Sequence, residues 1–557
     1  MENNNGQEME GIIKELEGKH FDIGVSGVWY GKNYGSLLTY YALYQTLTRL
    51  GYSVLMIHKL RVRKFDLEID AECHAKSFAE KYYENIAPAL WADEMKLLNR
   101  YCDMFLMGCD QVWNYGIASS FGLNNYFDYV EDDKKKLSYA SSFGHDVSFT
   151  PIEKLPIVTK LFHRFDAISV REASAVRVLK NEFGIEGTQV ADPVFLLERE
   201  EYEEILKDSK AEEDEKFMLA YILDPTPEIR EALLYVAEKK KLKLITIIAR
   251  GNKKECIKIL DMPNIIEETL ETSTWLWYIK HAEFVVTDSC HGVSFSLIFH
   301  RPFIAIANRQ RGIARFESLV DVMGIRDRYV YDAGQIQKDE KLLSNMDFSR
   351  IDEIFKMERK RSLKWLKDAL ASEKKQVVTV KDCVSKKECC GCGACSQICP
   401  VNAIHMEYDE EGILYPVVDE ETCIRCGKCV KVCPALHPYD SNREQPECYA
   451  AYGEDAIREV SSSGGIFSLV AEEVLEAGGA VCGAAFNDKF ELCQKVVYSK
   501  EELPALRGSK YIQSNTKNTF QEIKEVLDDG KPALYVGTSC LVAGLRGYLG
   551  KEYEQLF

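Results

Sequence analysis

The chain has 557 residues, 46% hydrophobic and 28% charged, which are ordinary values for a folded protein with several domains. Its 88 acidic and 70 basic residues give a net charge of −18, which argues against nucleic-acid binding because phosphate binding needs a basic surface. No apolar run reaches the roughly 20 residues of a membrane-spanning helix, and residues 1–19 lack a signal-peptide pattern, so we expect a cytoplasmic protein.

Strand-like and helix-length segments alternate over about residues 20–345, as in α/β folds with parallel sheets. An acidic stretch at 198–215 divides this region into halves of about 20–197 and 215–345. We therefore expect two doubly wound, Rossmann-like units with a cleft between them. The expected strands are 21–28, 53–57, 104–107, 167–170, 217–223, 242–248, 284–287 and 303–306.

Two strand-to-helix loops lie where such sheets bind ligands, outside the carboxyl ends of the strands. The first contains Asn33 and Gly35 and precedes a helix expected at 36–50. Its amides could hold an anion, although ordinary turns use the same residue types.

The second loop, at 287–292, contains Asp288, Ser289 and His291 ahead of another helix. His291 could take or give a proton near neutral pH. Alternatively, Asp288 or Ser289 caps the helix and His291 only packs in the interior. The sequence pattern leaves both readings open.

Six segments resemble, in family order, those of the polysaccharide pyruvyl transferase family. The resemblance implies a GT-B-like fold with its active site between two Rossmann-like halves. It also implies transfer of the enolpyruvyl part of phosphoenolpyruvate to a sugar, which forms a ketal and releases phosphate. The segments are Lys32-Asn33-Tyr34-Gly35, 108–114, 137–144, Ser169-Val170-Arg171-Glu172, Ala191-Asp192-Pro193 and 288–292.

That chemistry needs a proton donor and acceptor and cations that hold a carboxylate and a phosphate. The resemblance makes His291 the acid–base candidate and Arg171 the anion clamp. Arg311 and Arg315 are further candidates, with surface ion pairing as the alternative. The expected substrate-binding residues are Asn33, Gly35, Asp110, Ser289 and Arg311.

One position departs from the family pattern. Many members carry an arginine two residues before the histidine, in contact with the donor, and this chain has Ser289 there. A neutral hydroxyl does not replace a guanidinium against an anion, so the resemblance leaves the donor open.

After a long helix expected at 351–372 and a linker, two copies of the spacing C-x2-C-x2-C-x3-C-P follow. This run binds cubane iron–sulfur clusters, and in two-cluster modules the fourth cysteine ligates the other cluster. The segment 383–436 resembles the dicluster ferredoxin module, with Cys390 off register. The expected ligand sets are Cys389, Cys392, Cys395 and Cys433 for the first cluster, and Cys423, Cys426, Cys429 and Cys399 for the second.

A pair of structural zinc sites is the alternative, because C-x2-C pairs also bind zinc. Zinc sites usually use two such pairs, without a third cysteine two residues on or a proline after the fourth. The spacing therefore favours two 4Fe-4S clusters and electron transfer.

Residues 446–557 contain a serine-glycine run before a helix expected at 466–477 and a strand at 480–485. With the later motifs at 507–511 and 535–546, this region resembles the β subunit of coenzyme F-420 hydrogenase/dehydrogenase proteins. That family passes electrons between iron–sulfur clusters and a flavin, and the chain ends where the family continues, so we expect a truncated domain. The residues expected near FAD are Ser462, Ser463, Gly464, Gly465, Lys510, Gly537 and Cys540.

The sequence thus predicts a pyruvyl-transferase-like enzyme (residues 20–345) and a helix with linker (346–382). These are followed by a ferredoxin module (383–436) and part of a flavin-linked oxidoreductase (446–557). The expected partners are a sugar or polysaccharide precursor, phosphoenolpyruvate, and an electron donor or acceptor. The alternative is an electron-transfer protein whose N-terminal half is a non-catalytic binding module.

Overall fold

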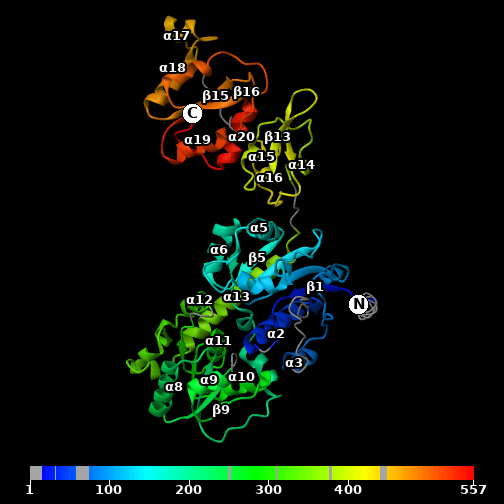
Figure 1. Cartoon of the computed structure of the whole chain (residues 1–557), viewed down its shortest axis with the longest axis vertical. Coiled ribbons are helices and arrows are strands. Elements are labelled where there is room, and N and C mark those ends of the chain that lie inside the picture. Colours follow the sequence, from blue (N-terminus) through cyan, green and yellow to red (C-terminus); the bar gives the residue numbers. More distant parts are fainter. Residues whose placement is uncertain are drawn as a thin grey trace. The chain divides into compact units, whose positions relative to one another are not determined.

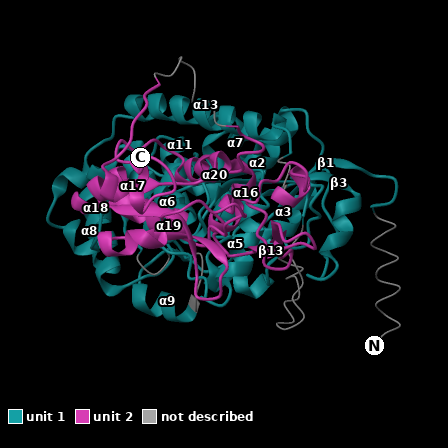
Figure 2. Ribbon diagram, turned by 90° about the horizontal axis from the view of Figure 1, so that it is seen from above, with its two compact units in different colours: residues 1–375 teal, residues 376–557 magenta. Residues whose placement is uncertain are grey.

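The computed structural model describes residues 16–31, 33–57, 74–248, 253–308, 312–374, 379–438 and 448–557. The chain forms two compact units, residues 1–375 (unit 1) and 376–557 (unit 2), which Figure 2 shows in two colours. Arg311 lies outside the described residues. Within them, no helix is both long and apolar enough to cross a membrane.

Unit 1 contains two six-stranded sheets in which every strand pair is parallel. Figure 1 labels β1 and β5 of the first sheet and β9 of the second. The first sheet has the order β2-β1-β3-β4-β5-β6 and the second β12-β11-β10-β7-β8-β9. Both are doubly wound, so the expected pair of Rossmann-like halves is confirmed. The strands are β1 (Phe21–Ser26), β2 (Val54–Met56), β3 (Cys102–Met107), β4 (Lys135–Ser141), β5 (Ala167–Val170), β6 (Thr188–Gln189), β7 (Phe217–Ile222), β8 (Lys243–Ile248), β9 (Ile265–Ile266), β10 (Phe284–Thr287), β11 (Phe303–Ile306) and β12 (Tyr329–Val330).

Helices connect these parallel strands. The stretch 198–215, expected to be a plain connection, contains α7, whose first turn is closed by a capping box between Glu198 and Glu201. The helices of unit 1 are α2 (Tyr34–Arg49), α3 (His74–Tyr82), α4 (Tyr115–Ala118), α5 (Leu155–His163), α6 (Ala173–Phe183), α7 (Arg199–Leu206), α8 (Pro227–Lys240), α9 (Lys253–Leu260), α10 (Thr272–His281), α11 (Cys290–Ile298), α12 (Ile313–Met323) and α13 (Ser349–Ala371).

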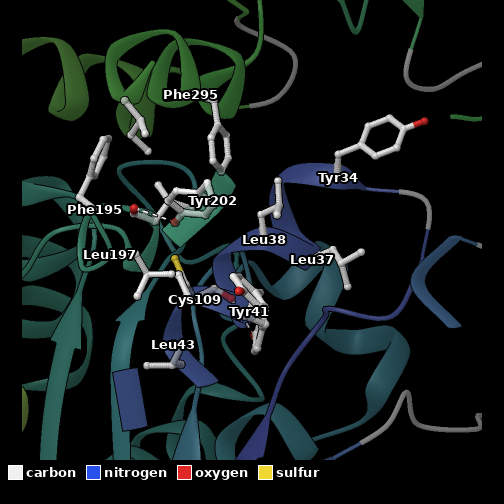
Figure 3. Close-up of a cluster of buried hydrophobic side chains, with 14 of the residues drawn as sticks. Tyr34, Leu37, Leu38, Tyr41, Leu43, Cys109, Phe195, Leu197, Tyr202 and Phe295 are labelled. Atoms are coloured by element: carbon white, nitrogen blue, oxygen red, sulfur yellow. Dashed lines mark hydrogen bonds between the residues drawn. The ribbon is translucent and has the colours of Figure 1, made fainter. Parts of the chain in front are cut away.

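A single apolar cluster joins the two halves of unit 1. It includes Leu37, Leu38 and Tyr41 of α2 in the first half and Phe295 of α11 in the second (Figure 3). Leu366 of α13 belongs to the same cluster, so this long helix is part of the core of unit 1. The shared core holds the amino-terminal ends of α2 and α11 against each other.

Each doubly wound sheet has a switch point, where strand order reverses and ligands usually bind. In the first sheet it lies between β1 and β3, and in the second between β7 and β10. The loops that follow β1, β3 and β10 carry Asn33, Asp110 and Ser289, and His291 follows in the first turn of α11. The predicted residues are therefore at the expected edge of each sheet.

Unit 2 starts with the cysteine-rich segment and a two-stranded antiparallel sheet, followed by a three-stranded sheet of order β16-β15-β17. Its strands are β13 (Ile404–Tyr408), β14 (Leu414–Val418), β15 (Ala480–Phe486), β16 (Leu492–Val497) and β17 (Ala533–Tyr535). Its helices are α14 (Val380–Cys383), α15 (Ala394–Gln397), α16 (Lys428–Lys431), α17 (Asp455–Glu459), α18 (Ile466–Glu476), α19 (Thr519–Asp528) and α20 (Ser539–Leu549).

Candidate functional site

Charged side chains from both halves of unit 1 meet in its interior, and we call Asp110, Arg171, Asp192, His291 and Arg315 the ion-paired centre. Arg171, directly after β5, donates from Nη1 to Asp192 Oδ2 at 2.6 Å. Its Nη2 lies 3.7 Å from Asp110 Oδ1, and Arg315 Nη1 of α12 lies 3.2 Å from the same oxygen. Asp110 thus lies between guanidinium groups from both halves.

Arg171 is 7% exposed, and its Nε and Nη2 have no hydrogen-bond partner among the described residues. Buried guanidinium N–H groups are costly unless something accepts from them. A small cavity of about 30 Å³, lined by Arg171, Asp192, Cys290 and Arg315 among others, adjoins this side chain. The Nε and Nη2 groups of Arg171 could therefore donate hydrogen bonds to a small anion.

His291 lies beside the same aspartate. Its Nε2 is 3.0 Å from Thr39 Oγ1 and 3.6 Å from Asp192 Oδ2. Burial alone would raise the pKa of Asp192, but the adjacent His291 and the charge of Arg171 hold that pKa far below its usual 3.8. Asp192 therefore remains ionised and links the candidate acid–base group to the candidate anion clamp.

The pKa of Asp110 is lowered as well, although burial opposes this, because Arg315 and Arg171 face its carboxylate. Its backbone has a φ of 79°, in the left-handed region that non-glycine residues rarely adopt. Such strain concentrates at functional sites, where the surrounding structure maintains it. The observed outlier supports a functional reading of Asp110.

The two loop residues of the first half have structural tasks. The Asn33 side chain caps α2 by accepting from Ser36 N, at 3.4 Å. Only glycine fits at position 35, because a Cβ there would lie 2.2 Å from His291 Nδ1. The absence of a side chain at position 35 lets the His291 ring pack on the first turn of α2.

Ser289 caps α11 by accepting from Gly292 N at 3.3 Å, and it is one of the two capping residues that the sequence left open. Asp288 does not cap the helix; its carboxylate accepts from Leu223 N at 2.7 Å and Asp224 N at 3.0 Å. These bonds tie the ends of β7 and β10 together.

Sequence reasoning missed two members of this arrangement. Thr39 lies inside an apolar helix, where no local signal distinguishes it, and Asp192 was recognised only as part of a motif. Arg315 had surface ion pairing as its alternative, but its side chain is 12% exposed and pairs with Asp110 in the interior. Its position in sequence does not reveal this burial.

In unit 2, cysteines of the two runs lie near one another. Cys399 lines one cavity together with Cys423, Cys426 and Cys429. For the other set, burial raises the pKa of the Cys389 thiol, and the nearby Cys390 and Cys433 raise it further. Cys433 has the same effect on buried Cys395. Cys399 of the first run therefore lies with three cysteines of the second, and Cys433 of the second run lies near Cys389 and Cys395 of the first.

Backbone geometry around these thiols also fits cubane clusters. Ala403 N donates to Cys399 Sγ at 3.2 Å, and Arg425 N donates to Cys423 Sγ at 3.4 Å. Gly391, Gly393 and Gly427 have φ values of 63°, 74° and 70°, which turn the chain tightly around the thiols. Amides directed at ligand sulfurs are typical of iron–sulfur sites and help to set their potentials.

The residues expected near FAD lie in three loops of unit 2, before α18, after residue 506 and after β17. Ser462 Oγ accepts from Ser509 N at 3.1 Å, and Gly465 begins α18 with a φ of 79°. Lys510 Nζ donates to the carbonyls of Arg507 and Leu506, at 2.8 and 3.0 Å, so its ammonium group is already hydrogen-bonded to the backbone. Ser463 and Gly464 belong to the same loop as Ser462.

Gly537 and Cys540 lie at the start of α20, where Cys540 Sγ is 3.0 Å from Thr538 Oγ1. Cys540 packs against the apolar cluster that contains Cys392. A Cβ at Gly544, one turn further along α20, would lie 3.1 Å from Cys392 Sγ. The helix that follows β17 therefore contacts the first cysteine run.

Comparison with known proteins places three families along the chain. Residues 33–310 match the model for polysaccharide pyruvyl transferase, 388–436 the 4Fe-4S dicluster domain, and 448–520 the N-terminal part of the coenzyme F420 hydrogenase/dehydrogenase β subunit. No curated protein matches the chain.

Among solved structures, a UDP-N-acetylglucosamine 2-epimerase from Rickettsia bellii is 10% identical, with a TM-score of 0.40, over 63% of this chain and 97% of that one. An O-GlcNAc transferase mutant from Thermobaculum terrenum is 10% identical, with a TM-score of 0.37, over 64% and 65%. Residues 33–310 therefore match the polysaccharide pyruvyl transferase family, and matches to a 4Fe-4S dicluster domain and to the N-terminal part of an F420 hydrogenase/dehydrogenase β subunit follow along the chain.

Proposed function

We propose that unit 1 transfers a pyruvyl or related small anionic group to a sugar hydroxyl, and that unit 2 carries electrons through two 4Fe-4S clusters. The transferase proposal rests mainly on Arg171. This side chain is buried near His291, and two of its nitrogens make no hydrogen bond among the described residues. The family match supplies the class of reaction.

Arg171 would hold the carboxylate or phosphate of the donor. Its Nε and Nη2 make no hydrogen bond among the described residues, and they could donate to two oxygens of one anion, the geometry in which arginine binds such groups best. Asp192 accepts a hydrogen bond from Nη1, which orients the guanidinium group before a ligand binds. Pre-orientation lowers the entropy cost of binding.

His291 would move the proton. With phosphoenolpyruvate as donor, two sugar hydroxyls add to the central carbon, the methylene carbon gains one hydroxyl proton, and phosphate leaves with the other. Thr39 and Asp192 flank His291 Nε2, which makes that nitrogen the atom facing the ion-paired centre. The role of Asp192 is to orient the ring.

Calorimetric titration with phosphoenolpyruvate, followed by a phosphate-release assay with sugar acceptors, tests this proposal. We expect binding in the wild type, at least tenfold weaker binding in Arg171→Met, and binding without turnover in His291→Asn. His281→Asn is the control, because His281 is exposed on α10. Full turnover in His291→Asn would contradict the acid–base assignment.

One observation favours the alternative of a binding module in unit 1. The hydroxyl of Ser289 is used as a helix cap, at the position where many family members place an arginine on the donor. Ligand binding that depends on Arg171, without phosphate release for any acceptor, would support this alternative.

In unit 2, the two crossed cysteine sets would hold the clusters, which supply one-electron transfer when bound. The amides of Ala403 and Arg425 would stabilise the ligand thiolates. Iron analysis of anaerobically purified protein tests the assignment. We expect Cys429→Ser to lose about half of the iron, since each run supplies three ligands of its own cluster, and Cys390→Ser to lose none.

We also propose that the carboxyl edge of β15 and β17 binds a flavin. The edge combines the starts of α18 and α20 with the loop at 462–465, and α20 contacts the first cysteine run. Because Ser462 and Lys510 are already hydrogen-bonded within the protein, we assign binding to Ser463 and the loop amides. Flavin fluorescence after denaturation of anaerobically purified protein tests this proposal.

A further inference from the structure

The two cysteine runs repeat each other in structure as well as in spacing, each position of the first recurring 34 residues later. Gly391 and Arg425 are equivalent and share left-handed backbones, with φ values of 63° and 51°. Gly393 and Gly427, at 74° and 70°, begin the equivalent helices α15 and α16. Equivalent positions of the two runs can therefore be compared directly.

Three equivalent pairs have a basic residue in the second run only: Gly391 and Arg425, Ala394 and Lys428, and Gln397 and Lys431. In the first run, these positions form a face covered by the rest of unit 2. A Cβ at Gly391 would lie 2.1 Å from Gln513 Nε2, and Ala394 is fully buried. The Gln397 side chain accepts from Phe520 N of α19 at 2.9 Å.

In the second run, the same three positions are exposed and basic. Arg425 and Lys428 line the cavity formed by Cys399, Cys423, Cys426 and Cys429. A Cβ at Gly427 would have no atom within 4 Å, so the surface beside it is open within unit 2. We call Arg425, Lys428 and Lys431 the basic face.

Two acidic side chains near the basic face, Glu420 and Asp382, already interact with other groups. Glu420 pairs with Lys381 at 2.5 Å, and the charge of Arg425 helps to lower the pKa of Asp382, after larger effects of hydrogen bonds from Thr379. Among the described residues, no carboxylate forms an ion pair with Lys428 or Lys431. The positive charge on α16 is therefore unneutralised in a chain of net charge −18.

We propose that the basic face docks an acidic one-electron carrier protein, which exchanges single electrons with the second cluster. The C-terminal sheet and its helices cover the equivalent face of the first run, so each cluster has its own exchange surface. One electron leaves the reduced carrier and enters the second cluster, or passes in the opposite direction. The inference rests on the proposed role of the eight cysteines as cluster ligands.

The basic face should increase the association rate of an acidic partner through electrostatic steering. Most of this chain repels an acidic protein, and a local basic patch beside the redox centre selects the productive orientation. Charges at the edge of an interface act mainly on the association rate and its salt dependence. Association should therefore slow when these charges are reversed.

The test uses anaerobically purified full-length protein and a small acidic 2Fe-2S ferredoxin as the probe. Reduced ferredoxin is mixed by stopped flow with wild type and with Lys428→Glu/Lys431→Glu. The control is Lys489→Glu/Lys495→Glu, which changes the net charge equally at exposed lysines of the β15–β16 hairpin. Calorimetric titration with oxidised ferredoxin measures binding separately from electron transfer.

We expect the second-order rate constant to fall about tenfold or more in Lys428→Glu/Lys431→Glu at low ionic strength. The difference should shrink as salt is added, with iron content unchanged and the control near wild type. Equal rates in all three proteins, or an equal fall in the control, would overturn the proposal. Wild type without iron would instead refute the cluster assignment itself.

Discussion

The ion-paired centre of unit 1 and the cysteine site of unit 2 are assembled in opposite ways. Asp110, Arg171, Asp192 and His291 come from distant parts of the chain and meet only because two sheets share one core. The cysteines come from two short runs whose turns are local. The first site depends on tertiary packing, and the second on spacing and left-handed glycines.

The difference shows where each site is vulnerable. A buried charge is stable only with its partner, so loss of one member of the centre leaves uncompensated charges in the interior. A cysteine run keeps its local turns when a residue elsewhere changes. The unfolding of each unit can be measured separately. All six tryptophans lie between residues 29 and 365, so tryptophan fluorescence reports on unit 1, whereas the visible absorbance of bound clusters reports on unit 2.

The largest effect is expected from Arg171→Met. It leaves the carboxylates of Asp110 and Asp192 buried without the guanidinium that faces both. Breaking a buried pair in this way costs about 3–5 kcal/mol. Chemical denaturation followed by tryptophan fluorescence measures the loss in unit 1.

Arg177→Met is the matched control, since Arg177 is exposed on α6 of the same unit. It should change the free energy of unfolding by less than about 0.5 kcal/mol. Equal losses in both variants would mean that Arg171 is not a buried pairing residue. Iron content should be unchanged in either variant.

The pH dependence of stability should separate two buried aspartates of unit 1. Burial raises the pKa of Asp288 to about 6, which amide donors and Asn308 only partly offset. Between its usual 3.8 and about 6, the folded state holds a proton that the unfolded state has lost, so stability falls as pH rises. The shift corresponds to at most about 3 kcal/mol.

Asp192 behaves in the opposite sense, because its pKa is lowered in the folded state. Its contribution is complete above the usual pKa of 3.8 and is lost only as pH falls below that value. From pH 4 to 6, the melting temperature of Asp288→Asn should therefore rise relative to wild type, whereas that of Asp192→Asn should keep a constant difference. A constant difference for Asp288→Asn would refute its raised pKa.

Sequence predicted the halves of unit 1 well because its parallel strands are short, apolar and separated by amphipathic helices. It placed the strand at 284–287 with the bounds that β10 has. It did not identify the two-residue strands β6, β9 and β12, since such short pairs are defined by neighbours and carry no periodicity. Nor did it identify β4, whose strand pattern overlaps a motif with a left-handed Ala140.

The ion-paired centre was only partly predictable for a related reason. Motifs identified Asp110, Arg171 and His291, but no sequence pattern states that Asp192 joins Arg171 to His291. That contact depends on the packing of α2, α11 and the segment after β6. The predicted cysteine sets need no such information, because the spacing itself predicts the crossed pairing.

A smaller effect is expected from Gly35→Ala, which tests how closely α2 supports His291. The new Cβ would lie 2.2 Å from His291 Nδ1, so the ring or the helix must move. Overpacking of this kind typically costs about 1–3 kcal/mol. Tryptophan-monitored unfolding measures it, with Gly31→Ala as control, because a Cβ there has no atom within 4 Å.

The smallest effect should distinguish the two cysteine runs from each other. Gly393→Ala and Gly427→Ala both place a side chain at a left-handed φ, of 74° and 70°, which costs about 1–2 kcal/mol. Only at position 393 does the Cβ also meet Thr516 Oγ1, at 2.2 Å, because the rest of unit 2 covers the first run. The cluster absorbance of Gly393→Ala should therefore be lost at lower denaturant than that of Gly427→Ala. Equal midpoints would show that the first run is no more tightly covered than the second, and would remove the asymmetry on which the basic face depends.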